Sequence, residues 1–122
     1  MADILVVDDE EMLRSALCRL LKSAGHRVTE AANGAEALAA IRSHMPQVIV
    51  TDIVMPVKEG IETILEIRKT YSNLKIIAIS GGGRGGQLSY LGFAQKAGAD
   101  HVMAKPFSRD DLLQAIEDMI SA

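Results

Sequence analysis

Short apolar segments alternate with amphipathic segments along the whole of this 122-residue chain. The apolar segments are rich in β-branched residues, which is typical of strands buried on both faces of a parallel sheet. The amphipathic segments carry apolar residues at three- and four-residue spacing, the period of a helix with one buried face. The pattern predicts strands at residues 3–7, 26–31, 47–51, 74–79 and 100–104, and helices at about 10–24, after 33, around 61–67, at 87–97 and at 108–120.

Helix-ending and helix-starting residues lie between these segments. Gly25 is expected to stop the first helix, because glycine adopts the left-handed backbone that ends many helices. Asn33 and Ser108 are expected N-caps, Pro46 closes the second helix, and MPVKEG at 55–60 is expected to be a loop. Apolar residues recur at helical spacing in the first of these helices at Leu13, Leu17, Leu20 and Ala24, and the third carries Ile61, Ile64, Leu65 and Ile67. In the second helix, the expected inner face is formed by Ala37, Leu38 and Ile41.

Strict alternation of strand and helix predicts an α/β fold, in which a five-stranded parallel sheet is doubly wound by helices on both of its faces. The chain length fits one domain over residues 1–122, without linker or repeat. Ligands of such sheets bind at the carboxyl ends of the strands. The polar residues at those ends are therefore the candidates for function.

Composition narrows the classes of function. With 48% hydrophobic and 24% charged residues and a net charge of -3, the chain is typical of a globular protein with no electrostatic reason to bind nucleic acid. A single cysteine, Cys18, excludes an intramolecular disulfide and a multi-thiolate metal site. The apolar run at 4–7 is stopped by Asp8 and Asp9, so neither a signal peptide nor a membrane span is expected. We expect a soluble, cytoplasmic protein.

Polar side chains end four of the five predicted strands: Asp8 and Asp9, Asp52, Ser80 and Lys105. Two like charges about 4 Å apart repel by roughly 4 kcal/mol at an effective dielectric of 20. Either some carboxylates are protonated, or Lys105 and a metal ion compensate them, and an all-oxygen site suits Mg²⁺. A metal ion beside a carboxylate favours phosphoryl transfer, with Asp52 as nucleophile and with Ser80 and Lys105 holding phosphoryl oxygens.

Four motifs at these strand ends resemble the receiver domain of two-component response regulators. They are VVDDE at 6–10, VTDIVMP at 50–56, the hydroxyl of Ser80 after an apolar strand, and AKPF at 104–107. Each motif alone is common, but all four in order, each at a strand end, are specific. The resemblance covers essentially the whole chain.

The resemblance implies a flavodoxin-like fold with strand order 2-1-3-4-5 and five helices, and phosphorylation of Asp52. By similarity, Asp9, Asp52 and the backbone carbonyl of Val54 would bind Mg²⁺, and Asp8 would place a metal-bound water. Lys105 would form an ion pair at the site. After phosphorylation, Ser80 would move to hydrogen-bond the phosphoryl group, and the surface around the fourth helix and fifth strand would transmit the change.

The glycine-rich stretch SGGGRGG at 80–86 contains a formal G-x-G-x-x-G. A dinucleotide-binding fingerprint should open the first strand-helix unit, whereas this stretch follows the fourth strand, so we reject that reading. We expect the Gly81 amide to reach a phosphoryl oxygen instead, and Arg84 either to steer an anion or to keep the loop soluble. One departure from many receivers is Val102, which stands where they carry a switch aromatic; His101 should face the opposite side of the strand and cannot replace it.

The expected function is that of a stand-alone response regulator that accepts a phosphoryl group from a histidine kinase or a histidine phosphotransfer protein. Met12 and Ser15 lie where receivers meet such partners, or are exposed residues without a role. Because no output domain follows Ala122, we expect a diffusible regulator, a relay intermediate or a phosphate sink, with a non-phosphorylated adaptor as the alternative. The protein would be a phosphoacceptor that assists its own phosphotransfer and dephosphorylation, rather than an enzyme.

Two other classes of protein share parts of this pattern. A flavodoxin-like electron carrier shares the expected fold, but the chain has no tryptophan and no hydroxyl- and glycine-rich loop after the first strand. A haloacid-type phosphatase would carry its nucleophile after the first strand with a second acid two positions on, where this chain has Glu10 within an expected helix. His26, His44 and His101 are not at metal-ligand spacing and are expected to be surface or packing residues.

Overall fold

The computed structural model describes residues 2–52, 57–80, 94–104 and 107–121. Its strands are β1 (Asp3–Val7), β2 (Arg27–Ala31), β3 (Val48–Asp52), β4 (Lys75–Ser80) and β5 (His101–Ala104). They form one parallel sheet in the order β2-β1-β3-β4-β5, which confirms the predicted topology. The helices are α1 (Glu11–Ser23), α2 (Gly34–Ser43), α3 (Val57–Thr70) and α5 (Arg109–Ser121).

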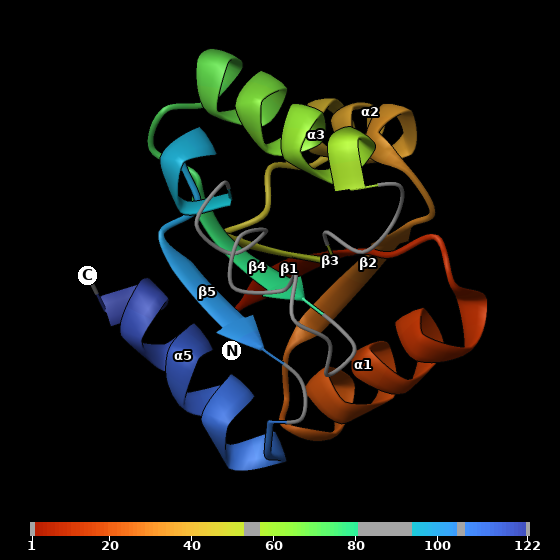
Figure 1. Cartoon of the computed structure of the whole chain (residues 1–122). Helices are drawn as coiled ribbons and strands as arrows, with labels where there is room; N and C mark the ends of the chain where they lie inside the picture. Colours follow the sequence, from red (N-terminus) through yellow and green to blue (C-terminus); the bar gives the residue numbers. More distant parts are fainter. Residues whose placement is uncertain (1, 53–56, 81–93, 105–106, 122) are drawn as a thin grey trace.

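Helices cover both faces of the sheet (Figure 1). One core layer joins α2, α3 and the helical residues 94–97 to the sheet, with β-strand residues such as Leu5, Ile49 and Ile76 at its centre. The other joins α1 and α5 to the opposite face, where Val6 and Val50 are fully buried. Because side chains alternate along each strand, one residue serves one layer and the next serves the other. This two-sided burial explains why the strands are continuous apolar runs.

The predicted helix ends are confirmed where the structure describes them. Gly25 has a φ of 93° after α1, a conformation that glycine adopts without steric cost. Asn33 caps α2 by accepting a hydrogen bond from the Glu36 amide at 2.9 Å. Ser108 and Asp111 cap α5 reciprocally, since the amide of Asp111 donates to Ser108 Oγ at 3.0 Å and the amide of Ser108 donates to Asp111 Oδ2.

The structure departs from the sequence pattern in three details. On α1, Leu13 is 38% exposed, and Ala24 is exposed and lies past the end of the helix; on α3, Leu65 is 50% exposed. On α1, apolar residues lie on more than one side of the helix, and the side centred on Cys18 and Leu21 packs against the sheet. The third detail is the start of α3, which begins at Val57 inside the stretch predicted as a loop.

The predicted fourth helix is seen only at its end, where residues 94–97 are helical; residues 87–93 lie outside the described part of the chain. His26 is a packing residue, as expected, and its Nδ1 accepts a hydrogen bond from the Ala2 amide at 3.1 Å. Within the described residues, no helix is long and apolar enough to cross a membrane.

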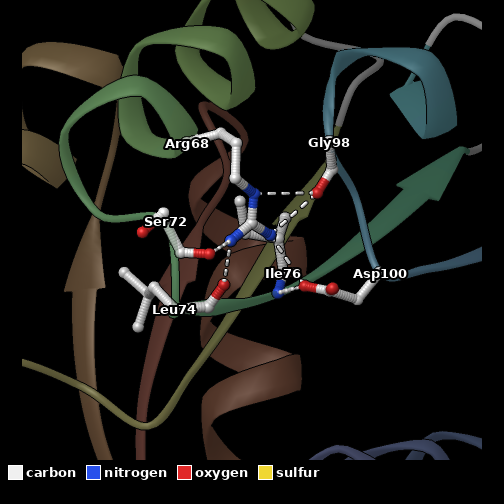
Figure 2. Close-up of polar contacts among 6 residues, drawn as sticks. All are labelled: Arg68, Ser72, Leu74, Ile76, Gly98 and Asp100. Carbon is white, nitrogen blue, oxygen red and sulfur yellow. Dashed lines mark hydrogen bonds and ion pairs between the residues drawn. The ribbon is translucent and has the colours of Figure 1, made fainter.

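At the amino ends of β4 and β5, the Arg68 side chain of α3 joins several turns (Figure 2). Its Nε and Nη2 both donate to the Gly98 carbonyl, at 3.1 and 2.8 Å. Its Nη1 donates to the carbonyls of Ser72 and Leu74, at 2.7 and 2.6 Å. Its Nη2 also forms an ion pair with Asp100 Oδ2 at 2.8 Å. Every N–H donor of this guanidinium therefore has an acceptor.

The same carboxylate ties this arginine to the sheet. Asp100 Oδ2 accepts a second hydrogen bond from the Ile76 amide, at 2.8 Å, at the start of β4 (Figure 2). The Asp100 amide in turn donates to the Ile76 carbonyl at 2.8 Å. The end of α3, the start of β4 and the entry to β5 are thus fixed relative to one another.

Candidate functional site

Strand register places Asp8 and Asp52 at the same level of the sheet. Val7 pairs with Thr51 across β1 and β3, and each acid is the next residue along its strand direction. Alternation along the strands directs both acids toward the face covered by α1 and α5, because Val6 and Val50, two residues earlier, pack there. The carboxyl ends of the two central strands therefore present two neighbouring carboxyl groups.

Both of these acids are buried. Asp8 is 1% exposed and Asp52 is 5% exposed, so each carboxyl group is removed from bulk water. Asp8 Oδ1 accepts a hydrogen bond from the Glu10 amide at 2.9 Å, and the Asp8 carbonyl accepts one from Arg14 Nη1 at 2.8 Å. Burial of acidic groups is costly unless they are hydrogen-bonded or have a compensating charge. An oxygen-rich pair of this kind fits a hard cation such as Mg²⁺.

The third predicted carboxylate differs from the other two, since Asp9 is exposed. In the part of the chain that the structure describes, no three His, Cys, Asp or Glu side chains are grouped so that they could hold a metal ion. The structure thus brings together Asp8 and Asp52 but does not gather three carboxylates. Val54, whose carbonyl was expected to complete the ligands, lies outside the described residues, and the ligand set stays a prediction.

Two buried hydroxyl groups lie near the acids. Ser80 ends β4 and is 0% exposed, and Thr51, which directly precedes Asp52, is also 0% exposed. Among the described residues, neither Ser80 Oγ nor Thr51 Oγ1 has a hydrogen-bond partner. Both point to the face covered by α2 and α3, because Ile49 and Ala78, two positions earlier, pack there. A buried hydroxyl without a partner costs about 1–3 kcal/mol, so each such group needs an explanation.

Sequence reasoning identified Ser80 but missed Thr51. The signal available in the sequence was the threonine that stands between the apolar run VIV at 48–50 and Asp52. Lys105 and Gly81 lie outside the described residues. The neighbour of Lys105, Ala104, pairs with Ser80 across β4 and β5, which is the strand end where the lysine was expected.

The predictions for β5 are confirmed. Val102 is partly buried and packs against the core layer of α2 and α3, whereas His101 is exposed. No aromatic residue therefore takes the position of the switch side chain on β5. On α1, Met12 is 82% exposed and Ser15 is partly buried.

Cys18 has no features of a reactive or metal-binding thiol. It is buried in the core layer under α1, and burial, with a smaller contribution from Glu30, raises the pKa of its thiol to about 11. A thiol with so high a pKa is almost wholly protonated at neutral pH and is a poor nucleophile. This agrees with its interpretation as an ordinary helix residue.

Comparison with known proteins identifies the class. The family model for the response regulator receiver domain matches residues 4–117, and the chain belongs to this family. Phosphorylation and dependence on Mg²⁺ are typical of receiver domains, which act in two-component signalling with histidine kinases or phosphotransfer proteins.

Individual relatives match nearly the whole length of the chain. It is 35% identical over 119 residues to the chemotaxis protein CheY of Halobacterium salinarum, covering 98% of this chain and 97% of that protein. It is 37% identical over 114 residues to CheY of Thermotoga maritima, covering 93% and 92%. The crystal structure of the receiver domain of NtrX from Brucella abortus superimposes with a TM-score of 0.90 at 32% identity, covering 98% of this chain and 99% of that one.

Proposed function

We propose that this receiver domain accepts a phosphoryl group on Asp52 in a Mg²⁺-dependent reaction and signals through protein contacts that change on phosphorylation. The observation that carries the proposal is the placement of Asp52. It ends the central strand β3, is 5% exposed and lies level with Asp8. On the neighbouring strand β4, the hydroxyl of Ser80 has no hydrogen-bond partner among the described residues.

The donor would be the phosphohistidine of a histidine kinase or a histidine phosphotransfer protein. A carboxylate oxygen of Asp52 attacks the phosphorus, the new oxygen–phosphorus bond forms, and the phosphorus–nitrogen bond breaks. The imidazole, protonated on its other ring nitrogen, leaves as a neutral group with that electron pair. Beyond this attack by Asp52, the part of the protein is to position the carboxylate and to stabilise the charge on the phosphoryl oxygens.

Asp9, Asp52 and the Val54 carbonyl would hold the Mg²⁺, and Asp8 would hold a metal-bound water. When bound, the ion would neutralise phosphoryl charge next to the acids. The position of Asp52 at the end of a strand would hold its carboxylate in place for attack, since strands are more rigid than loops. Lys105 and the Gly81 amide would bind other phosphoryl oxygens, in line with their place next to Ala104 and Ser80.

Ser80 would respond to phosphorylation. Its buried Oγ has no partner to lose within the described residues, so turning toward a phosphoryl oxygen would cost little. The gain of a charge-assisted hydrogen bond would favour that orientation, and the segment after β4 would follow. Because β5 carries Val102 in place of an aromatic, we expect movement of this segment, rather than of a side chain on β5, to change the binding surface.

Two surfaces would serve partners. The phosphodonor would approach α1 beside the acids, where Met12 is 82% exposed. The target would bind near β5 and α5, where a groove of about 400 Å³ is lined by residues including His101, Phe107, Asp111 and Gln114. The chain would act as a phosphoacceptor and not as an enzyme that turns over a separate substrate.

The intact mass of the protein after incubation with acetyl phosphate tests the proposal. We expect one phosphoryl group per chain with Mg²⁺, none with a chelator, and none in Asp52→Asn. Asp118→Asn, which removes an exposed carboxylate from α5, is the matched control and should be labelled like the unchanged protein. Failure of the unchanged protein to be labelled by acetyl phosphate and by its histidine kinase would instead support a non-phosphorylated adaptor.

A further inference from the structure

Arg14 joins α1 to both neighbouring strands at the acidic end of the sheet. Its Nη1 donates to the Asp8 carbonyl at 2.8 Å, and its Nε forms an ion pair with Glu30 Oε1 of β2 at 3.0 Å. The Arg14 side chain is 16% exposed, whereas that of Glu30 is 42% exposed. The arginine is therefore enclosed between the helix and the sheet, and Glu30 holds it from the solvent side.

The carbonyl that Arg14 contacts belongs to the peptide unit between Asp8 and Asp9. A peptide unit is planar, so fixing its oxygen fixes the orientation of the Asp9 amide as well. On the other side, the Glu10 amide donates to Asp8 Oδ1 at 2.9 Å. The backbone and the carboxylate of Asp8 are thus held by two different groups, and the direction in which the chain leaves β1 follows from both contacts.

We propose that Arg14, oriented by Glu30, is a positioning residue that sets the geometry of the Asp8–Asp9 peptide and thereby the cation affinity of this edge. The inference rests on the proposed function, because the cation site is part of it. In this role Arg14 itself would touch neither substrate nor cation. Groups that orient ligands from behind commonly change metal affinity by about 10–100-fold when they are removed.

The direction in which Mg²⁺ affinity changes when Arg14 is replaced distinguishes a positioning role from a purely electrostatic one. A guanidinium beside acidic groups repels a cation, so removing its charge alone would tighten Mg²⁺ binding. Removing a group that orients the ligands would weaken it. Lysine keeps the charge but has no planar fork that can hold a carbonyl and a carboxylate at once. Arg14→Lys should therefore weaken binding as well, although the charge is conserved.

In the first experiment, the full chain is titrated with magnesium chloride and binding is monitored by NMR. For Arg14→Met and Arg14→Lys we expect a dissociation constant about tenfold higher than for the unchanged protein. Arg19→Met removes an exposed arginine from the same helix and should leave the constant unchanged. Denaturant unfolding of each variant verifies that it is folded. Equal or tighter binding by Arg14→Met would overturn the inference.

The second experiment needs no metal ion. Hydrogen exchange of the Glu10 amide in metal-free protein reports whether Asp8 Oδ1 still accepts its hydrogen bond. We expect faster exchange in Arg14→Met than in the unchanged protein and in Arg19→Met; equal rates in all three would contradict the positioning role. If the unchanged protein bound no Mg²⁺, the proposed function would fail first, whereas binding that is insensitive to Arg14 would refute this inference alone.

Discussion

Polar groups differ in their hydrogen bonding between the two ends of the sheet. At the amino ends of the strands, the guanidinium of Arg68 has an acceptor for each donor, and Asp100 joins it to the Ile76 amide. At the carboxyl ends, the hydroxyls of Thr51 and Ser80 are buried without a partner among the described residues. The comparison indicates that one end is built to fix the fold, and that the other keeps polar groups available.

The difference has an energetic meaning. A satisfied hydrogen bond contributes about 1 kcal/mol to stability, whereas a buried group left without a partner costs about 1–3 kcal/mol. Proteins retain such costs where function requires them, as at binding sites and switches. Substitutions at the amino ends should therefore lower stability, while removal of the Thr51 and Ser80 hydroxyls, which lack partners within the described residues, should raise it.

The largest effect is expected at Arg68. Arg68→Met should lower the free energy of unfolding by about 3 kcal/mol, because three backbone carbonyls lose the donor that Arg68 supplies and the Asp100 carboxylate loses its ion pair, keeping only the hydrogen bond from the Ile76 amide. Denaturant unfolding measures the change. Lys69→Met removes an exposed cation from the same helix and should change the stability by less than about 0.5 kcal/mol. Equal effects of the two substitutions would show that the Arg68 cluster does not fix the amino ends.

A smaller loss is expected at Gly98, which the same cluster encloses. Gly98 has a φ of +123°, and a Cβ there would lie 2.9 Å from Arg68 Cγ. Gly98→Ala should therefore lower the free energy of unfolding by about 2 kcal/mol, through backbone strain and displacement of the arginine.

Gly25 offers the matched control for Gly98. It also has a positive φ, of +93°, but nothing lies within 4 Å of its added Cβ. Gly25→Ala should cost only about 1 kcal/mol, because backbone strain is the sole contribution. If both glycines gave the same loss in denaturant unfolding, contact with Arg68 would have no part in the cost.

At the carboxyl ends of the strands, we expect substitutions to raise the free energy of unfolding instead of lowering it. Thr51→Val replaces a hydroxyl that has no partner in the described part of the chain by a methyl group of similar volume, and it should raise the free energy of unfolding by about 1 kcal/mol. Thr29→Val makes the same change at an exposed position of β2 and controls for the strand preference of valine. A loss of stability in Thr51→Val, beyond the effect at Thr29, would mean that the Thr51 hydroxyl is bonded in the native protein.

The smallest change in stability is expected at Ser80. Ser80→Ala should raise the free energy of unfolding by about 0.5 kcal/mol, because it removes a buried hydroxyl and almost no volume. Under the proposed function, the variant should still be phosphorylated, but hydrogen exchange after β4 should no longer respond to phosphorylation. A response of unchanged size would remove Ser80 from the proposed switch.

Much of this arrangement could be predicted from local sequence patterns. Continuous apolar runs between helical segments specify a doubly wound sheet. The expected strand bounds agree with those of the structure to within about one residue, because Gly25, Asn33 and Ser108 mark the neighbouring helix ends by local chemistry. The candidate acids followed from a topological rule, since parallel strands align their carboxyl ends. Local pattern and topology together were enough to place Asp8, Asp52 and Ser80 at the carboxyl ends of β1, β3 and β4.

Features that depend on contacts between distant segments could not be predicted in this way. The sequence offers two apolar stripes on α1, and only packing against the sheet selects Cys18 and Leu21 over Leu13. The contacts of Arg14 with Glu30 and of Arg68 with Asp100 cross 16 and 32 residues. Burial of Asp8 together with exposure of Asp9 likewise depends on how the chain leaves β1, which is fixed by groups on α1 and β2.

The chemical role of Asp52 is tested most directly by locating the phosphoryl group. The protein is phosphorylated by its histidine kinase, the acyl phosphate is reduced with borohydride, and the peptides are sequenced by mass spectrometry. We expect the reduced residue at Asp52 and at no other acid, Asp8 and Asp9 included. A phosphoryl group on another residue of an unchanged, folded chain would contradict the assignment of Asp52 as the phosphoacceptor.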